Sequence, residues 1–204
     1  MADKPIQEQF GETIIAAVRA FARADMEDVP AIEQNYLSHM NDLGLRRALA
    51  ETFFGARWIY KLGLALLVKD LEQMAHVRSQ IIDYGPVCEG LLYDMIHHAL
   101  TKNIMKGQKY RFVDTAHMTN SIRWSTGIDN NLAKQSFHWQ INVAEDEGIV
   151  ARPLPDRLHG LRKERNSVHL RLRTQKTYLG ASMNAYQVLL DTVEQTRTWK
   201  HTHP

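Results

Sequence analysis

The chain has 204 residues, of which 44% are hydrophobic and 24% are charged, the composition of an ordinary globular protein. Its single cysteine, Cys88, excludes an intramolecular disulfide framework and a zinc site built from several cysteines. The longest aliphatic run, residues 64–68, is far shorter than the roughly 20 residues of a membrane span. Residues 1–5 lack the charged-then-apolar pattern of a signal peptide. We therefore predict a cytoplasmic protein that does not enter a membrane.

The net charge of +2 conceals an uneven distribution, because residues 1–101 are net acidic and residues 102–204 are net basic. Lysine and arginine concentrate in two segments, 102–123 and 157–176. Such clusters can supply a field that binds phosphate groups. A solvated basic face without any partner has the same composition, so charge alone leaves both interpretations open.

Apolar residues recur at helical spacing through the first third of the chain. Steps of three and four predict helices over residues 6–21, 30–40 and 45–67. Pro30 can open the second of these at its first turn, and residues 41–44 carry a stop signal. We predict that residues 1–44 form a helical arm added to a bundle of residues 45–204.

The next segment predicts one long helix over residues 71–100. Its apolar residues keep a single phase through Gly85 and Pro86; they are Val77, Ile81, Tyr84, Cys88, Leu91 and Met95. Proline inside a helix costs about 3 kcal/mol and kinks it, but a new helix beginning at Pro86 would reset the phase. We therefore favour one kinked helix over two shorter ones.

Residues 102–131 have no clean period and are predicted to form a long basic loop that could include short helical turns, a kind of segment that is often functional. Helical periodicity returns over residues 132–147, with Gly148 as the predicted stop.

Two further helices complete the predicted fold. Residues 153–155 read as a connector, after which Asp156 is a suitable N-cap for a helix reaching Leu172. A final helix is predicted over residues 178–198. The fold class is therefore all-α, a bundle of about six or seven helices.

One helix face carries a polar stripe. Its members are spaced i, i+3, i+4 and i+7, and they are Arg162, Arg165, Asn166 and His169. A guanidinium matches phosphate with a planar fork, an imidazole moves a proton near neutral pH, and a carboxamide can orient either group. Because RNA supplies its own nucleophile, the 2′-hydroxyl, this set could cleave a phosphodiester without a metal ion or other cofactor. We predict neither a metal site nor a cofactor.

The stripe resembles the motif of the HEPN superfamily (higher eukaryotes and prokaryotes nucleotide-binding domain). These all-α bundles include many metal-independent endoribonucleases of toxins and antiviral defence systems. Their signature is an arginine and a histidine separated by four to six residues, usually with a polar residue after the arginine. Arg162 and His169 have six residues between them. Arg165-Asn166 resembles the arginine–polar step, but only three residues separate Arg165 from His169, so either arginine could be the functional one.

Residues 80–92 carry a second resemblance, to the earlier HEPN helix that bears an inward glutamate before a Leu-Leu pair. The resemblance implies that Glu89 lies near the stripe and orients its arginine. The resemblance to HEPN proteins covers roughly residues 45–195. It also implies a homodimer, in which two stripes form a composite site across a two-fold axis, and for a toxin it implies a neutralising partner protein.

The activity implied by the resemblance is RNA cleavage to a 2′,3′-cyclic phosphate and a 5′-hydroxyl. Arg162 and Arg165 would hold the scissile phosphate, His169 would move the proton, and Asn166 and Glu89 would orient the set. The RNA backbone would contact basic residues of the two clusters, namely Lys109, Arg111, Arg123, Lys163, Arg171 and Arg173.

A non-catalytic interpretation of the same residues stays open. The stripe could be a solvated helix face, or its arginines could pair with Glu89 as a structural contact. The chain would then be a HEPN-like binding or adaptor module for RNA, nucleotides or a protein partner. In a nuclease, two copies of His169 should converge on one open cleft, whereas in an adaptor they need not.

Overall fold

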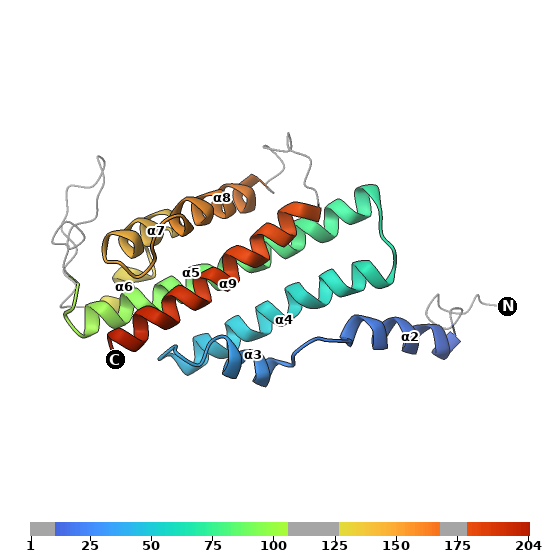
Figure 1. Ribbon diagram of the computed structural model, residues 1–204, viewed down its shortest axis with the longest axis horizontal. Helices are drawn as coiled ribbons and strands as arrows, with labels where there is room; N and C mark the ends of the chain where they lie inside the picture. The colour runs from blue at the N-terminus through green and yellow to red at the C-terminus, as the bar shows by residue number, and fades with distance from the viewer. Residues whose placement is uncertain (1–10, 106–126, 168–178) are drawn as a thin grey trace.

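The computed structural model describes residues 11–105, 127–167 and 179–204 as helices joined by turns (Figure 1). In chain order the helices are α2 (Gly11–Arg23), α3 (Val29–Asn35), α4 (Leu43–Ala65), α5 (Asp70–Thr101), α6 (Ile128–Leu132), α7 (Phe137–Asp146), α8 (Leu154–Ser167) and α9 (Leu179–Thr202). The described ranges contain no strand, and the predicted all-α bundle is confirmed. Within these ranges, no helix combines the length and the apolar composition needed to cross a membrane.

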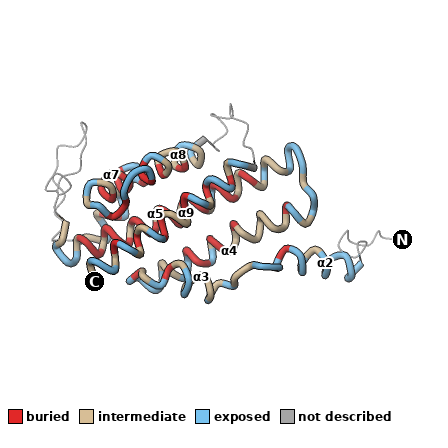
Figure 2. Tube along the Cα trace, in the orientation of Figure 1, coloured by how far each residue is buried: buried red, intermediate tan, exposed pale blue. Residues whose placement is uncertain are grey.

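Helix α5 is the centre of the bundle. It pairs with α4 as an antiparallel hairpin, α9 runs along it, and α6, α7 and α8 pack on it as well (Figure 1). The buried stretches of these helices face one another, whereas α2 is exposed along most of its length (Figure 2). A group that α8 turns toward the core can therefore meet residues of α5, and α7 and α9 also pack on α8.

Pro86 lies inside α5, so the predicted continuity of this helix is confirmed. Tyr84, Val87 and Cys88, on either side of Gly85-Pro86, are completely buried. The carbonyl of Ile82 loses its usual partner at Pro86, and Ile82 is 39% exposed, on the side that water can reach. Burial of the other faces of α5 offsets the free-energy cost of placing Pro86 inside the helix.

Two predicted helix boundaries are wrong. The helix predicted over residues 132–147 begins later, at Phe137 of α7, because Ser136 caps it by accepting a hydrogen bond from the backbone N–H of Trp139 (3.2 Å). Helix α6 lies almost entirely before that range, at the end of the segment predicted as a loop. Helix α8 begins at Leu154, so Asp156 lies in its first turn and is not its N-cap. Burial of Leu154 and Leu158 on one face extends this helix toward its N-terminus. Gly148 does end α7, with a φ of +71°.

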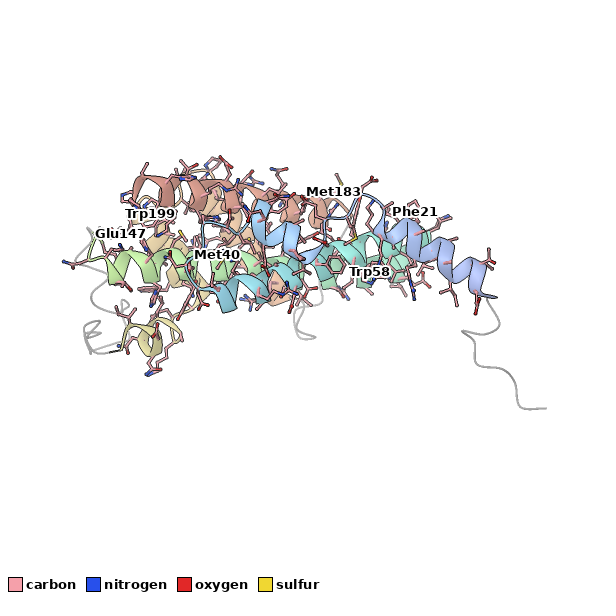
Figure 3. The ribbon with its side chains drawn as sticks, turned by 90° about the horizontal axis from the view of Figure 1, so that it is seen from below. Phe21, Met40, Trp58, Glu147, Met183 and Trp199 are labelled. Atoms are coloured by element: carbon pink, nitrogen blue, oxygen red, sulfur yellow. The ribbon has the colours of Figure 1, made fainter. Side chains whose placement is uncertain are left out.

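Segments of the predicted N-terminal arm attach to the bundle to different degrees. Helix α2 buries only Ala22, and Phe21 stays 51% exposed on the surface. Residues 29–42 are anchored more firmly, because Met40 is 4% exposed and the buried carboxylate of Asp94 accepts hydrogen bonds from the backbone N–H groups of Asn41 (3.0 Å) and Asp42 (3.2 Å). Figure 3 shows Met40 and Phe21 at different points along this arm.

His39 provides a pH-dependent contribution to stability. Its Nε2 lies 3.0 Å from the hydroxyl of Thr196 on α9. Burial, reinforced by the positive charge of Arg197, His201 and Lys200, lowers the pKa of His39 from 6.5 to about 4. The unfolded chain takes up this proton near pH 6.5, whereas the folded chain excludes it until about pH 4. The contribution is therefore complete above pH 6.5 and declines as the pH falls between these values.

We expect the titration of His39 to lower the free energy of unfolding by about 1–2 kcal/mol at pH 5 relative to pH 7. Urea denaturation at both pH values measures the loss. His39→Gln keeps a partner for Thr196 but does not titrate, so its loss should be smaller by that amount. An equal loss in both proteins would contradict the assignment.

Candidate functional site: an arginine stripe facing helix α5

Helix α8 brings one arginine of the stripe onto α5. Nη1 of Arg165 donates a hydrogen bond to Oε2 of Glu89 at 2.6 Å, and the two side chains are 33% and 28% exposed. The structure thus brings together the arginine and the glutamate that the HEPN resemblance associates. A charge-assisted contact of this length, shielded in part from water, fixes the orientation of both groups.

Gly85 makes this contact sterically feasible. A Cβ atom at residue 85 would lie 2.9 Å from Cδ of Arg165, closer than carbon atoms approach without a clash. The stem of Arg165 therefore crosses α5 over the glycine. Glu89 follows four residues later on the same face of α5, where the guanidinium arrives. The Gly85…Glu89 spacing is what positions this arginine.

Arg162 lies one turn before Arg165 and has a different environment. Among the described residues, no carboxylate forms an ion pair with it. Its Nε is buried without a hydrogen-bond partner. The positive charge of Arg162 is thus not neutralised locally and is available to an anionic ligand.

The remaining predicted site residues divide into two groups. Lys163 and Asn166 are exposed on α8. Six others lie outside the described residues; they are Lys109, Arg111, Arg123, His169, Arg171 and Arg173.

Sequence analysis missed a histidine pair next to the stripe. The rings of His138 on α7 and His159 on α8 have centroids 5.0 Å apart. Nε2 of His159 lies 3.0 Å from Oδ1 of Asn142. Burial, followed by the positive charge of His138 and Arg162, lowers the pKa of His159. The signal in the sequence is spacing, because His159 precedes Arg162 by three residues and so extends the stripe by one turn.

A groove of about 530 Å³ opens beside Glu89, between α4, α5 and the turn that joins α6 to α7. Leu49 and Tyr93 contribute apolar wall, and Gln140 contributes a carboxamide. Gln140 is 3% exposed, and its Oε1 has no hydrogen-bond partner. The volume falls within the range of small-ligand sites, so the groove can accept a group of nucleotide size.

Metal binding and thiol chemistry are the two alternatives to acid–base catalysis. The described ranges contain no group of three or more histidine, cysteine, aspartate or glutamate side chains that could hold a metal ion. Cys88 is fully buried, and burial raises the pKa of its thiol to about 12, so it does not act as a nucleophile near neutral pH.

Comparison with known proteins returned no match: no protein-family model, no curated protein and no solved structure is detectably similar to the chain. The functional argument therefore depends on the chain's own residues and on their geometry.

Proposed function

We propose that the chain is a metal-independent endoribonuclease of the HEPN type. The observation that carries the proposal is the Arg165–Glu89 ion pair, 2.6 Å long, which fixes one arginine of the stripe beside a second arginine that has no carboxylate partner. A phosphodiester needs a cation where charge develops during cleavage, and Arg162 can supply it. The half-buried setting strengthens that interaction relative to bulk water.

In the proposed reaction the 2′-oxygen of a ribose attacks the adjacent phosphorus, and the bond from phosphorus to the 5′-oxygen of the next nucleotide breaks. A base accepts the 2′-hydroxyl proton, and an acid donates a proton to the leaving 5′-oxygen. We assign proton transfer to His169 and the developing phosphate charge to Arg162. Arg165, held by Glu89, acts as a positioning residue, and Asn166 orients the phosphate or the imidazole.

A homodimer would supply both proton-transfer groups at once. One copy of His169 could act as the base and its symmetry mate as the acid if the stripes meet across a two-fold axis. Facing stripes bring like charges together, and RNA phosphate would offset that repulsion. The groove beside Glu89 has room for a nucleotide next to the scissile bond. If the enzyme acts as a toxin or in defence, a partner protein would be expected to restrain it.

A second candidate function is a HEPN-like binding or adaptor module without turnover. One observation favours it: Glu89 neutralises Arg165, which leaves Arg162 as the stripe's single uncompensated arginine among the described residues. In that case the ion pair would join α8 to α5 and contribute to stability alone.

The deciding experiment uses purified protein, with a His169→Ala variant as the control, in EDTA. Each is incubated with total tRNA and with a short single-stranded RNA. Cleavage by the unmodified protein alone, leaving a 2′,3′-cyclic phosphate, supports the ribonuclease, and an RNA with a 2′-deoxyribose at the cut site should resist. Equal cleavage by both proteins contradicts the assigned site. No cleavage by either favours the binding module.

A further inference from the structure

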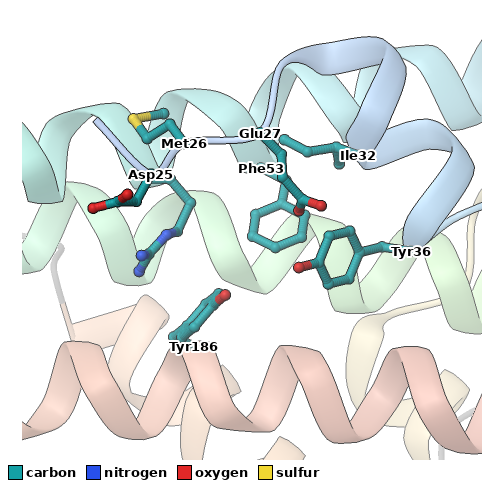
Figure 4. Close-up of a pocket in the computed structure, with 8 residues that line it drawn as sticks. Asp25, Met26, Glu27, Ile32, Tyr36, Phe53 and Tyr186 are labelled. Carbon is teal, nitrogen blue, oxygen red and sulfur yellow. The ribbon is translucent and has the colours of Figure 1, made fainter. Parts of the chain in front are cut away.

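A separate cavity lies where the N-terminal arm meets α4 and α9. It has a volume of about 170 Å³ and includes no residue of α8. Asp25 and Glu27 reach it from the loop before α3, Phe53 and Arg57 from α4, and Tyr186 from α9. Figure 4 shows these segments converging around it. The volume is below the usual range of drug-sized pockets, so the cavity suits a small molecule and not a nucleotide.

Aromatic rings form its walls. The ring of Phe53 lies edge-on to that of Tyr36, with centroids 5.2 Å apart, and 6.0 Å from that of Tyr186. Phe53 is 2% exposed and so is fixed by the core. In Figure 4, Tyr36 and Tyr186 extend toward the cavity from different helical segments. These rings are rigid and already in place, so ordering the walls costs a ligand little.

Arg57 brings a positive charge to the cavity. Its Cζ lies 4.4 Å from the ring centroid of Tyr186 and 5.1 Å from that of Tyr60. The tyrosine faces hold the guanidinium, but within the described ranges no carboxylate forms an ion pair with it. A planar guanidinium with its charge uncompensated is suited to bind a carboxylate through two parallel hydrogen bonds.

Two carboxylates, Asp25 and Glu27, line the same cavity without forming an ion pair with Arg57. Glu27 accepts a hydrogen bond from Nδ2 of Asn35 at 2.7 Å. Burial and a hydrogen bond to Glu27 raise the pKa of Tyr36 to about 12, so its phenol stays protonated beside the carboxylate. Asp25 is 93% exposed and pairs with Nζ of Lys61 at 3.8 Å, so Glu27 is the carboxylate that matters for the cavity. Glu27 and Arg57 thus place opposite charges on one cavity without forming an ion pair with each other.

We propose that this cavity binds a small zwitterion, a molecule with a carboxylate and an ammonium group close together, as in a free α-amino acid. The carboxylate would contact Arg57, the ammonium would face Glu27, and the apolar part would pack against Phe53. A simple anion would meet repulsion from Glu27, and a simple cation would meet repulsion from Arg57. A molecule that carries both charges avoids each penalty.

The ligand would bridge the arm and the bundle, because Glu27 belongs to the first and Arg57 to the second. A molecule that binds only the folded chain raises its melting temperature in a concentration-dependent way. Thermal unfolding of the full chain in the presence of each common L-amino acid, at millimolar concentration, therefore serves as the first screen. Calorimetric titration then gives the dissociation constant of any amino acid that raises the melting temperature. RNA cleavage is not involved, so this test and the ribonuclease test succeed or fail separately.

Charge-blocked ligands and matched variants test the assignment. The methyl ester and the N-acetyl derivative of the active amino acid each lack one charge and should bind at least about tenfold more weakly. Arg57→Gln and Glu27→Gln should each weaken binding by a similar factor, with circular dichroism confirming that each variant folds. Arg47→Gln, on the same helix but paired with Glu33 and Glu51 at the surface, should bind normally.

Three results would overturn the proposal. The first is that no amino acid produces a saturable rise in melting temperature. The second is that the blocked derivatives bind as well as the parent compound. The third is that both glutamine variants, correctly folded, retain full affinity.

Discussion

Replacing Arg162 with alanine is expected to lower the single-turnover rate of RNA cleavage by about 100- to 1000-fold, the loss typical of removing a preorganised donor from a developing charge. Arg162 has no carboxylate partner in the described ranges, so its whole charge is available to the phosphate. Its partly buried position limits the screening by water that would otherwise weaken the contact. The rate is measured with a defined RNA in EDTA.

The corresponding changes around Arg165 should act differently. Arg165→Ala and Glu89→Gln disturb a positioning contact, so we expect about tenfold losses, smaller than for Arg162. Gly85→Ala adds a methyl group 2.9 Å from Cδ of Arg165 and should displace that side chain in the same way, although alanine favours the helix. Arg152→Ala, at an exposed position before α8, is the matched control and should cleave normally. If Arg165→Ala were inactive while Arg162→Ala kept full activity, the two roles would be reversed.

The fold could be predicted where its cause is local in the sequence. The apolar phase through Gly85 and Pro86 depends only on spacing, and it predicted the continuous helix α5 correctly. The start of α7 was predicted too early because apolar residues, Leu132 and Ala133, also precede it at helical spacing. There a single capping serine, Ser136, outweighs the weak helical preference of its neighbours. Boundaries set by one hydrogen bond are the least visible in a periodic pattern.

The candidate site was likewise predictable only where its cause is local in the sequence. The association of Glu89 with the stripe followed from the resemblance, but the sequence could not decide between Arg162 and Arg165. Which of the two arginines contacts Glu89 depends on the crossing of the Arg165 stem over Gly85, a contact between α5 and α8 that spacing within α8 does not reveal. The cavity at Arg57 is harder still to predict, because its walls come from three distant segments and meet only once the bundle is packed.

Phe53→Ala is expected to cause the largest loss of stability among the changes considered. Phe53 is 2% exposed and contacts the rings of Tyr36, Tyr84 and Tyr186, with centroid distances of 5.2, 6.5 and 6.0 Å. Removing a buried phenyl group loses its transfer free energy and leaves a void, which together cost about 3–5 kcal/mol. For a chain of this size, we expect the melting temperature to fall by roughly 10 °C. Urea and thermal unfolding measure the change, and Phe21→Ala, at a position 51% exposed, is the control with a much smaller expected effect.

The same variant tests how residues 29–42 relate to the bundle. Tyr36 precedes α4, Tyr84 lies on α5 and Tyr186 on α9, so Phe53 joins three parts of the chain through one ring. Because these contacts share one buried side chain, we expect Phe53→Ala to shift a single cooperative transition to lower temperature. Intrinsic fluorescence and circular dichroism should then report the same midpoint. Separate midpoints, with the segment that carries Tyr36 melting first, would mean that residues 29–42 fold as a distinct unit on the surface of the bundle.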